Sequence, residues 1–139
     1  MSKLHYKTEV TVQSGRAGHA KSVDGLLDIP LAFPKALGGA GNATNPEQLL
    51  AAGFGACFGT SMLGSAKQLG IDLKDVTVSP DVELYQGEPS WFFKITLNVQ
   101  TNGISKEDAE KAVAAAEQVC AFSHALRGNV EVTIQLIGF

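Results

Sequence analysis

The chain has 139 residues, of which 45% are hydrophobic and 18% are charged, and its formal net charge is −3. This length suits one domain over residues 1–139, and a weakly acidic chain without a run of Lys or Arg does not suit nucleic acid or an acidic membrane surface. Two cysteines, Cys57 and Cys120, are too few for a secreted disulfide scaffold, and the first ten residues lack the apolar core of a signal peptide, so we expect a cytoplasmic protein.

The first third of the chain predicts three strands. Apolar and polar residues alternate over residues 4–13, which is typical of a half-buried strand. Residues 14–19 then predict a hairpin turn, and two short strands are expected over residues 20–23 and 26–32. A glycine-rich connector leads to a helix start, in which Asn45 is the N-cap and Pro46 takes the first helical position.

The helix that follows is apolar on every side. Residues 49–66 contain no charged residue and approach the length of a transmembrane helix, but they are rich in Gly, Ala, Ser and Thr, so we interpret them as a buried helix of a soluble protein. One sheet of about six short strands and one further helix hardly suffice to cover it. We therefore expect a homodimer in which the central helices of two chains bury each other. The alternative is a monomer in which the chain itself covers the helix.

The second half of the chain predicts a hairpin, a helix and a last strand. Residues 76–85 and 93–100 alternate between apolar and polar and form the antiparallel hairpin. Ser105 and Asp108 form a capping-box signature before an amphipathic helix that runs to Cys120, and residues 130–136 form the last strand. The order β-β-β-α-β-β-α-β predicts a two-layer α+β fold.

The two cysteines suggest thiol redox chemistry. A thiolate is the form that attacks a peroxide or a disulfide, and burial in an apolar helix raises the pKa of a thiol, so a reactive Cys57 needs a cation beside it. Arg16, in a glycine-flanked turn, is the natural candidate, and Glu47 could fix its guanidinium through a two-pronged ion pair. Taken singly, Arg16 is also explained as a solvated turn residue and Glu47 as an acid at a helix N-terminus.

The spacing along the central helix raises a geometric problem. On one continuous helix, Glu47 and Cys57 lie about 15 Å apart along the axis, so one arginine does not easily contact both. Either the helix is interrupted, or Arg16 and Cys57 come from different subunits than Glu47, or Arg16 alternates between partners. The sequence likewise does not show whether Cys57 and Cys120 meet; if they do, a Cys57 sulfenic acid can condense with Cys120, and if not, both are buried structural cysteines.

No metal or cofactor is expected. The three histidines, His5, His19 and His124, and the two cysteines have none of the spacings of known metal sites. The glycine-rich connector before the central helix lacks the lysine of a phosphate-binding loop.

Three segments, residues 14–25, 34–58 and 118–132, together carry a family resemblance. In collinear order and over nearly the whole chain they resemble the organic hydroperoxide resistance (Ohr) branch of the Ohr/OsmC family; the block NPEQLLAAGFGACF is specific, and the GRAGH turn favours the Ohr branch. The resemblance implies an intertwined α+β homodimer. It also implies a thiol-dependent peroxidase for organic and fatty-acid hydroperoxides, reduced by dihydrolipoamide or lipoylated proteins, without metal or haem.

The resemblance also implies roles for individual residues. Cys57 matches the peroxidatic cysteine and Cys120 the resolving one, while Arg16 matches the arginine that activates the thiolate and Glu47 its acidic partner. Four bulky apolar residues suit a wall around a fatty substrate, although the same side chains could equally be core. These residues are Phe33, Phe54, Phe58 and Met62.

Some positions depart from the family pattern. Ala121 follows the resolving cysteine where a proline is common, and His124 replaces a more usual polar residue. The segment QGEPSWFFKITL replaces a glycine-rich turn, so Trp91 and Phe92 could reshape a rim or the dimer surface. Two other functions fit the same fold: a lipid-binding module with incidental cysteines, and a redox sensor whose disulfide changes a partner interaction.

Overall fold

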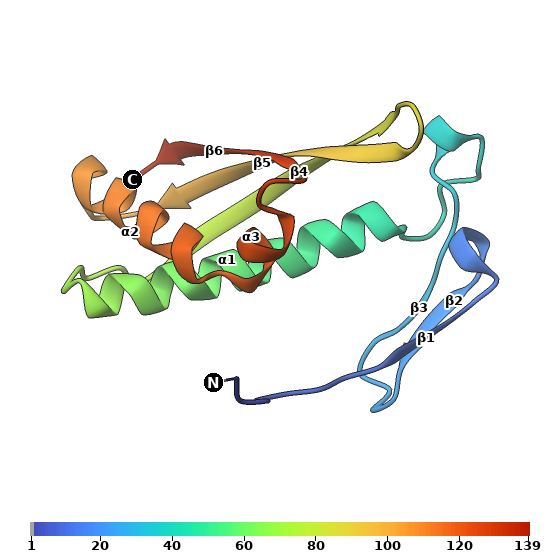
Figure 1. Cartoon of the computed structure of the whole chain (residues 1–139), viewed down its shortest axis with the longest axis horizontal. Helices are drawn as coiled ribbons and strands as arrows, with labels where there is room; N and C mark the ends of the chain where they lie inside the picture. The colour runs from blue at the N-terminus through green and yellow to red at the C-terminus, as the bar shows by residue number, and fades with distance from the viewer. Residues whose placement is uncertain (1) are drawn as a thin grey trace. The chain divides into compact units, whose positions relative to one another are not determined.

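The computed structural model describes residues 2–139, which fall into two compact units, one ending at Leu49 and the other spanning Leu50–Phe139 (Figure 1). Each unit has its own three-stranded sheet. The predicted single sheet of about six strands is therefore wrong for one chain, in which the long helix α1 (Pro46–Gln68) follows a first sheet of three strands and precedes a second. Whether the two units act as one domain over residues 1–139 stays a prediction.

The N-terminal unit is a small antiparallel meander of β1 (Val10–Gln13), β2 (His19–Ser22) and β3 (Asp28–Pro30). The predicted first strand is shorter than expected, since only residues 10–13 pair with β2. The predicted turn is present: a 3-10 segment, Gly15–Ala17, joins β1 to β2, and Ser14 and Gly15 both have positive φ, 60° and 56°. A Cβ on Gly18 would fall 1.5 Å from the Gln13 carbonyl oxygen, so this hairpin closes only with glycine there.

The C-terminal unit is a two-layer arrangement of helices on a mixed sheet. β4 (Val76–Gln86) and β5 (Trp91–Thr101) form the predicted antiparallel hairpin, and β6 (Glu131–Gly138) pairs with β5 in parallel. The parallel pairing requires a crossover, which contains α2 (Lys106–Val119) and α3 (Ala121–Leu126). Helices α1, α2 and α3 lie on one face of this sheet (Figure 1), which confirms the α+β class and the predicted order of strands.

Local capping explains where two of the helices begin. The side-chain oxygen of Asn45 accepts a hydrogen bond from the N–H of Gln48 at 2.9 Å, and the Ser105 hydroxyl oxygen accepts one from Asp108 at 3.1 Å. Both caps are as predicted. The short helix α3 was not predicted, because the sequence after Cys120 has no apolar periodicity long enough to indicate a second helix.

The core of the C-terminal unit lies between α1, α2 and the inner face of the sheet. Phe54, Phe58 and Met62 of α1 have no exposed surface, and Leu97 and Val99 of β5 are equally buried. A methyl group at Gly55 would lie 3.2 Å from the Pro80 ring, so this glycine allows close contact between α1 and β4. We conclude that α1 is held to the sheet along one face.

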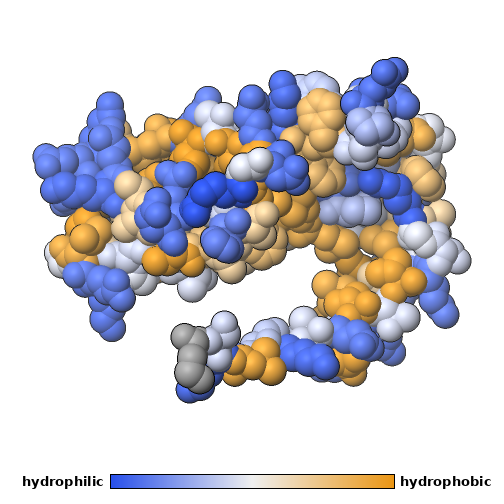
Figure 2. Space-filling model, viewed as in Figure 1, coloured by the Kyte–Doolittle hydropathy of each residue, from blue (hydrophilic) through white to orange (hydrophobic). Residues whose placement is uncertain are grey.

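The opposite face of α1 is exposed in the C-terminal unit. Four residues at helical spacing, Ala52, Ala56, Thr60 and Gly64, are exposed. Figure 2 shows apolar residues on the surface of the molecule. The helix is long and apolar enough to cross a membrane, with a mean hydropathy of 1.4 in its most apolar window, but core helices of soluble proteins have the same property. The C-terminal unit therefore does not bury α1 on every side.

Candidate active site

The structure brings the two cysteines together. Cys57 lies near the middle of α1 and is half-buried, and Cys120, at the joint between α2 and α3, is 1% exposed. Their Sγ atoms are 3.4 Å apart, close enough for one thiol to donate a hydrogen bond to the other. Both are free thiols. The arrangement suits formation of a disulfide after a small movement, because a disulfide brings two sulfurs to about 2.05 Å.

The backbone of Cys120 explains why its side chain leaves the α2 helix. Its N–H still donates to the Ala116 carbonyl at 2.9 Å, as the last hydrogen bond of α2, but its φ and ψ of −69° and 123° are extended. Its own carbonyl then accepts the first hydrogen bond of α3, from His124 at 3.0 Å. Cys120 is thus both the C-cap of one helix and the N-cap of the next.

An aromatic contact fastens α3 to α1 near Cys57. The Phe122 ring stacks on Phe54 with centroids 5.8 Å apart, and a Cβ at Gly53 would lie 2.9 Å from its Cζ. Because Gly53 and Cys57 are four residues apart, they lie on the same side of α1. Phe122 therefore contacts α1 one turn before Cys57, on the side of the helix that carries Cys57.

The surroundings of Cys120 act on its pKa in opposite directions. Burial raises the pKa of this thiol, whereas the nearby N–H groups of Ser123 and Phe122, the Ser123 hydroxyl and the Cys57 thiol favour the thiolate. These polar groups outweigh burial, so the pKa lies below its ordinary value of 9.0. Sequence reasoning missed Ser123, because its place beside Cys120 depends on the break between α2 and α3, which has no sequence signal.

A second cluster lies in the N-terminal unit. The guanidinium of Arg16 donates to both carboxylate oxygens of Glu47, at 2.7 and 2.9 Å, which is the two-pronged ion pair expected from the sequence. The side chains are 28% and 14% exposed. The hydrogen bond to Glu47 raises the pKa of Arg16 despite some desolvation, so the guanidinium is charged at any physiological pH.

The continuous course of α1 excludes one of the three explanations for how Arg16 could serve both Glu47 and Cys57. Glu47 is in its first turn and Cys57 lies ten residues further along the same unbroken helix. The alternative in which the helix is interrupted between these two residues is therefore wrong. A site shared between subunits, and an Arg16 side chain that alternates between partners, stay as predictions.

The residues expected to hold a fatty substrate are mostly core. Phe54, Phe58 and Met62 have no exposed surface in the C-terminal unit, whereas Phe33 in the N-terminal unit is 40% exposed. Contact between these side chains and a bound alkyl chain stays a prediction. Within residues 2–139, no three His, Cys, Asp or Glu side chains are grouped closely enough to hold a metal ion.

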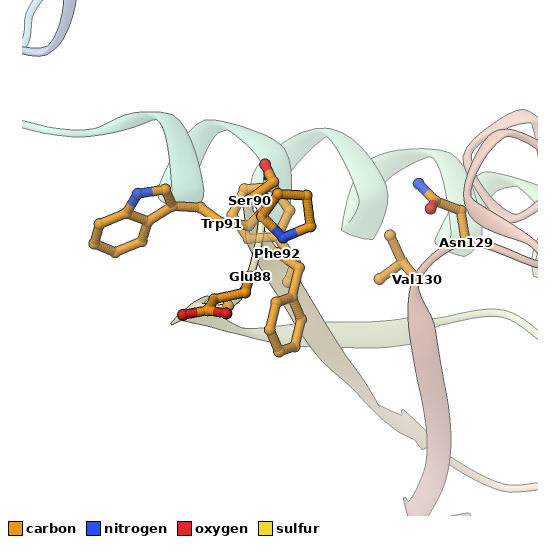
Figure 3. Close-up of a pocket in the computed structure, with 9 residues that line it drawn as sticks. Glu88, Ser90, Trp91, Phe92, Asn129 and Val130 are labelled. Atoms are coloured by element: carbon orange, nitrogen blue, oxygen red, sulfur yellow. Dashed lines mark hydrogen bonds between the residues drawn. The ribbon is translucent and has the colours of Figure 1, made fainter.

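A separate depression lies where the β4–β5 hairpin turns (Figure 3). Its volume is about 550 Å³, and it is lined by Gly87, Glu88, Pro89, Ser90, Trp91, Phe92, Phe93, Asn129 and Val130. Trp91 and Glu88 lie at one end and Asn129 and Val130 at the other. Trp91 and Phe92 are 54% and 45% exposed and line this depression, and an effect on a substrate rim or on the dimer surface stays a prediction.

Comparison with known proteins identifies the family of the chain. Residues 39–135 match the model of the OsmC-like protein family. The chain is 41% identical to the organic hydroperoxide resistance protein OhrB of Bacillus subtilis over 94% of this chain and 97% of that one, and 39% identical to an organic hydroperoxide resistance protein of Xanthomonas axonopodis pv. citri over 96% of each.

Solved structures of organic hydroperoxide resistance proteins have the same fold as this chain. An organic hydroperoxide resistance protein from Legionella pneumophila superposes with a TM-score of 0.91 at 42% identity, covering 95% of this chain and 97% of that one. The crystal structure of OhrB from Bacillus subtilis gives a TM-score of 0.86 at 39% identity, with 94% and 98% covered. The chain therefore belongs to the OsmC/Ohr family, among the organic hydroperoxide resistance proteins.

Proposed function

We propose that this protein is a thiol-dependent peroxidase that reduces organic hydroperoxides to alcohols in the cytoplasm. The observation that carries the proposal is the 3.4 Å separation between the Sγ atoms of Cys57 and Cys120, which belong to different helices. A pair of free thiols at this distance is well suited to pass through a sulfenic acid and a disulfide. Relatives named organic hydroperoxide resistance proteins support the choice of substrate class.

The reaction has an oxidation, a condensation and a reduction. The Cys57 thiolate attacks the terminal oxygen of R–O–OH, the O–O bond breaks, and the alkoxide takes a proton and leaves as the alcohol R–OH. Cys57 is then a sulfenic acid. The Cys120 sulfur attacks the Cys57 sulfur, the S–O bond breaks, and water leaves as the Cys57–Cys120 disulfide forms. A dithiol, for which we propose dihydrolipoamide or a lipoylated protein, returns the disulfide to two thiols by exchange.

Arg16 and Glu47 complete the proposal. A cation beside Cys57 stabilises its thiolate, and Arg16 is held in a defined orientation by Glu47. We propose that the working site forms in a homodimer, in which the uncovered face of α1 is buried and an Arg16 reaches a Cys57, of its own or the other chain. The apolar residues Phe33, Phe54, Phe58 and Met62 are proposed to contact the alkyl group of the substrate.

A peroxide-consumption assay tests the function. Reduced protein is mixed with tert-butyl or linoleic hydroperoxide, with dihydrolipoamide as the reductant, and the loss of peroxide is followed. We expect turnover in the wild type and none in Cys57→Ser, while Cys120→Ser consumes at most about one peroxide per chain before Cys57 is overoxidised. Full activity in Cys57→Ser would refute the mechanism. No peroxide loss by the wild type, together with co-purified lipid, would favour a lipid-binding module instead.

A further inference from the structure

We propose that Arg127 is a positioning residue for Cys120, which it holds in reach of Cys57 by tying the end of α3 to the last turn of α2. The Nη2 atom of Arg127 donates a hydrogen bond of 2.6 Å to the backbone carbonyl of Glu117. This inference rests on the proposed peroxidase function, because it concerns the step in which the disulfide forms.

The hydrogen bond closes a loop around the resolving cysteine. Glu117 is in the last turn of α2, and Arg127 directly follows α3 at its C-cap. Cys120 lies between them as the only residue that separates the two helices. With Arg127 bonded to Glu117, the two helices are connected at both ends of α3: by the chain at Cys120 and by the guanidinium at Arg127.

The chemistry of the contact favours a cation. The carbonyl of Glu117 is one of the last four of α2, which have no partner within that helix and carry the negative end of the helix dipole. A charged donor on such a carbonyl makes a stronger hydrogen bond than a neutral one. The side chain of Arg127 is exposed, so the bond acts at the surface of the unit while Cys120 is buried beneath it.

The position of Cys120 matters because two reactions compete for the Cys57 sulfenic acid. In one, Cys120 attacks it and water leaves as the disulfide forms. In the other, a second hydroperoxide oxidises it to the sulfinic acid and leaves as the alcohol, which ends catalysis. The first is intramolecular, so its rate depends on how well the Cys120 sulfur is held near 3.4 Å from its target. A loose α2–α3 joint favours the second.

Two substitutions at Arg127 distinguish the effect of the hydrogen bond from the effect of side-chain size. Arg127→Met keeps the aliphatic stem without the donor, and Arg127→Lys keeps a charged donor. Lys111→Met is the matched control, since it makes the same kind of change on the exposed face of α2, where Lys111 pairs with Glu107 at 3.1 Å. Far-UV circular dichroism of all four proteins verifies that they are folded.

The experiment treats the reduced full chain with rising tert-butyl hydroperoxide, without a reductant, and then alkylates the remaining thiols. Intact mass and peptide mapping give the fraction of Cys57 in the disulfide and in the sulfinic acid. We expect Arg127→Met to keep the rate of the first oxidation and to lower the ratio of disulfide to sulfinic acid about tenfold, as for loss of one charged hydrogen bond. Arg127→Lys should recover most of this loss, and Lys111→Met should match the wild type.

The outcomes distinguish this inference from the function on which it rests. If the wild type forms the disulfide and Arg127→Met gives the same ratio, Arg127 does not position Cys120. If Arg127→Met and Lys111→Met lower the ratio equally, a general effect of removing surface charge replaces the specific one. If the wild type consumes peroxide without forming a Cys57–Cys120 disulfide, both the proposed mechanism and this inference are wrong.

Discussion

At Cys120, burial raises the pKa of the thiol, and polar groups of Ser123 and Phe122 together with the Cys57 thiol of α1 lower it. The pKa lies below its ordinary value, with Ser123 contributing through both its backbone N–H and its hydroxyl. In the mechanism that we propose, Cys120 is thus prepared both to attack as a thiolate and to leave as one when the disulfide is reduced.

The first prediction concerns this thiol. Ser123→Ala removes a hydroxyl that favours the Cys120 thiolate, so the pKa of Cys120 should rise. The pH dependence of iodoacetamide alkylation, measured in a Cys57→Ser background, gives the midpoint directly. Ser90→Ala, a change at an exposed serine of the β4–β5 turn, is the control. A midpoint that Ser123→Ala leaves unchanged would mean that the hydroxyl does not act on this sulfur.

A second prediction concerns the turn between β2 and β3. The Ser22 hydroxyl donates to the Asp24 carboxylate at 2.6 Å and the Leu26 N–H donates at 3.0 Å, which together hold the pKa of Asp24 below 3.8. Because the pKa is lowered on folding, the stabilisation is present above this value and is lost as the pH falls through the lowered pKa. Ser22→Ala should shift the Asp24 pKa upward; carbon-13 NMR titration of the carboxyl group checks this, and an unchanged pKa would contradict it.

On the scale of elements, the glycines of α1 are not equivalent. A Cβ at Gly55 meets the Pro80 ring at 3.2 and 3.3 Å and the Val78 carbonyl at 3.3 Å, whereas a Cβ at Gly64 meets no atom within 4 Å. Glycine in a helix interior costs about 1 kcal/mol relative to alanine. In a single chain, replacement by alanine should therefore raise the free energy of unfolding at Gly64 and lower it at Gly55.

The third prediction follows from this difference. In a monomeric chain, Gly64→Ala should raise the free energy of unfolding by about 1 kcal/mol, and Gly55→Ala should lower it because β4 must move away from α1. Urea denaturation of both variants in the Ala56→Glu background, which should disfavour the proposed dimer, measures the two effects. A loss of stability in Gly64→Ala would contradict the expectation and would mean that another surface packs closely against that glycine.

Elements with a strong local signal were predictable from the sequence. The caps at Asn45 and Ser105 and the alternation in β4 and β5 gave the helix starts and the hairpin, since each depends on residues close together in the chain. The break at Cys120 and the short helix α3 were not predictable, because their geometry depends on the docking of Phe122 on Phe54. For the site, the Arg16–Glu47 pair was expected, but the approach of Cys57 to Cys120 depends on the tertiary fold and has no sequence signal.

On the scale of the whole molecule, the main feature is an apolar helix that the C-terminal unit covers on one face only. In its most apolar window, 28% of α1 is buried, and the exposed positions include the small residues Ala52 and Ala56. Small side chains allow two backbones to approach closely, and removal of such a surface from water stabilises an association. This agrees with the homodimer that we propose.

The fourth prediction tests that association. Sedimentation velocity should give a mass of about twice the 14.6 kDa of one chain. Ala56→Glu places a charge on the exposed face of α1 and should shift the protein toward the monomer, because a buried unpaired charge is unfavourable. Glu110→Gln, on the exposed face of α2, is a control that should leave the mass unchanged. A wild-type chain that sediments as a monomer would overturn the proposed dimer.

The parallel pairing of β6 with β5 has a consequence for biosynthesis. The hairpin β4–β5 can form as soon as its residues leave the ribosome, but β6 pairs only after the whole crossover with α2 and α3 has been made. Cys120 belongs to that crossover, so its approach to Cys57 is completed among the last events of chain folding. A nascent chain still lacking its C-terminal strand thus carries Cys57 without Cys120 held beside it. For the peroxidase that we propose, oxidative stress during translation would therefore inactivate growing chains more readily than finished ones.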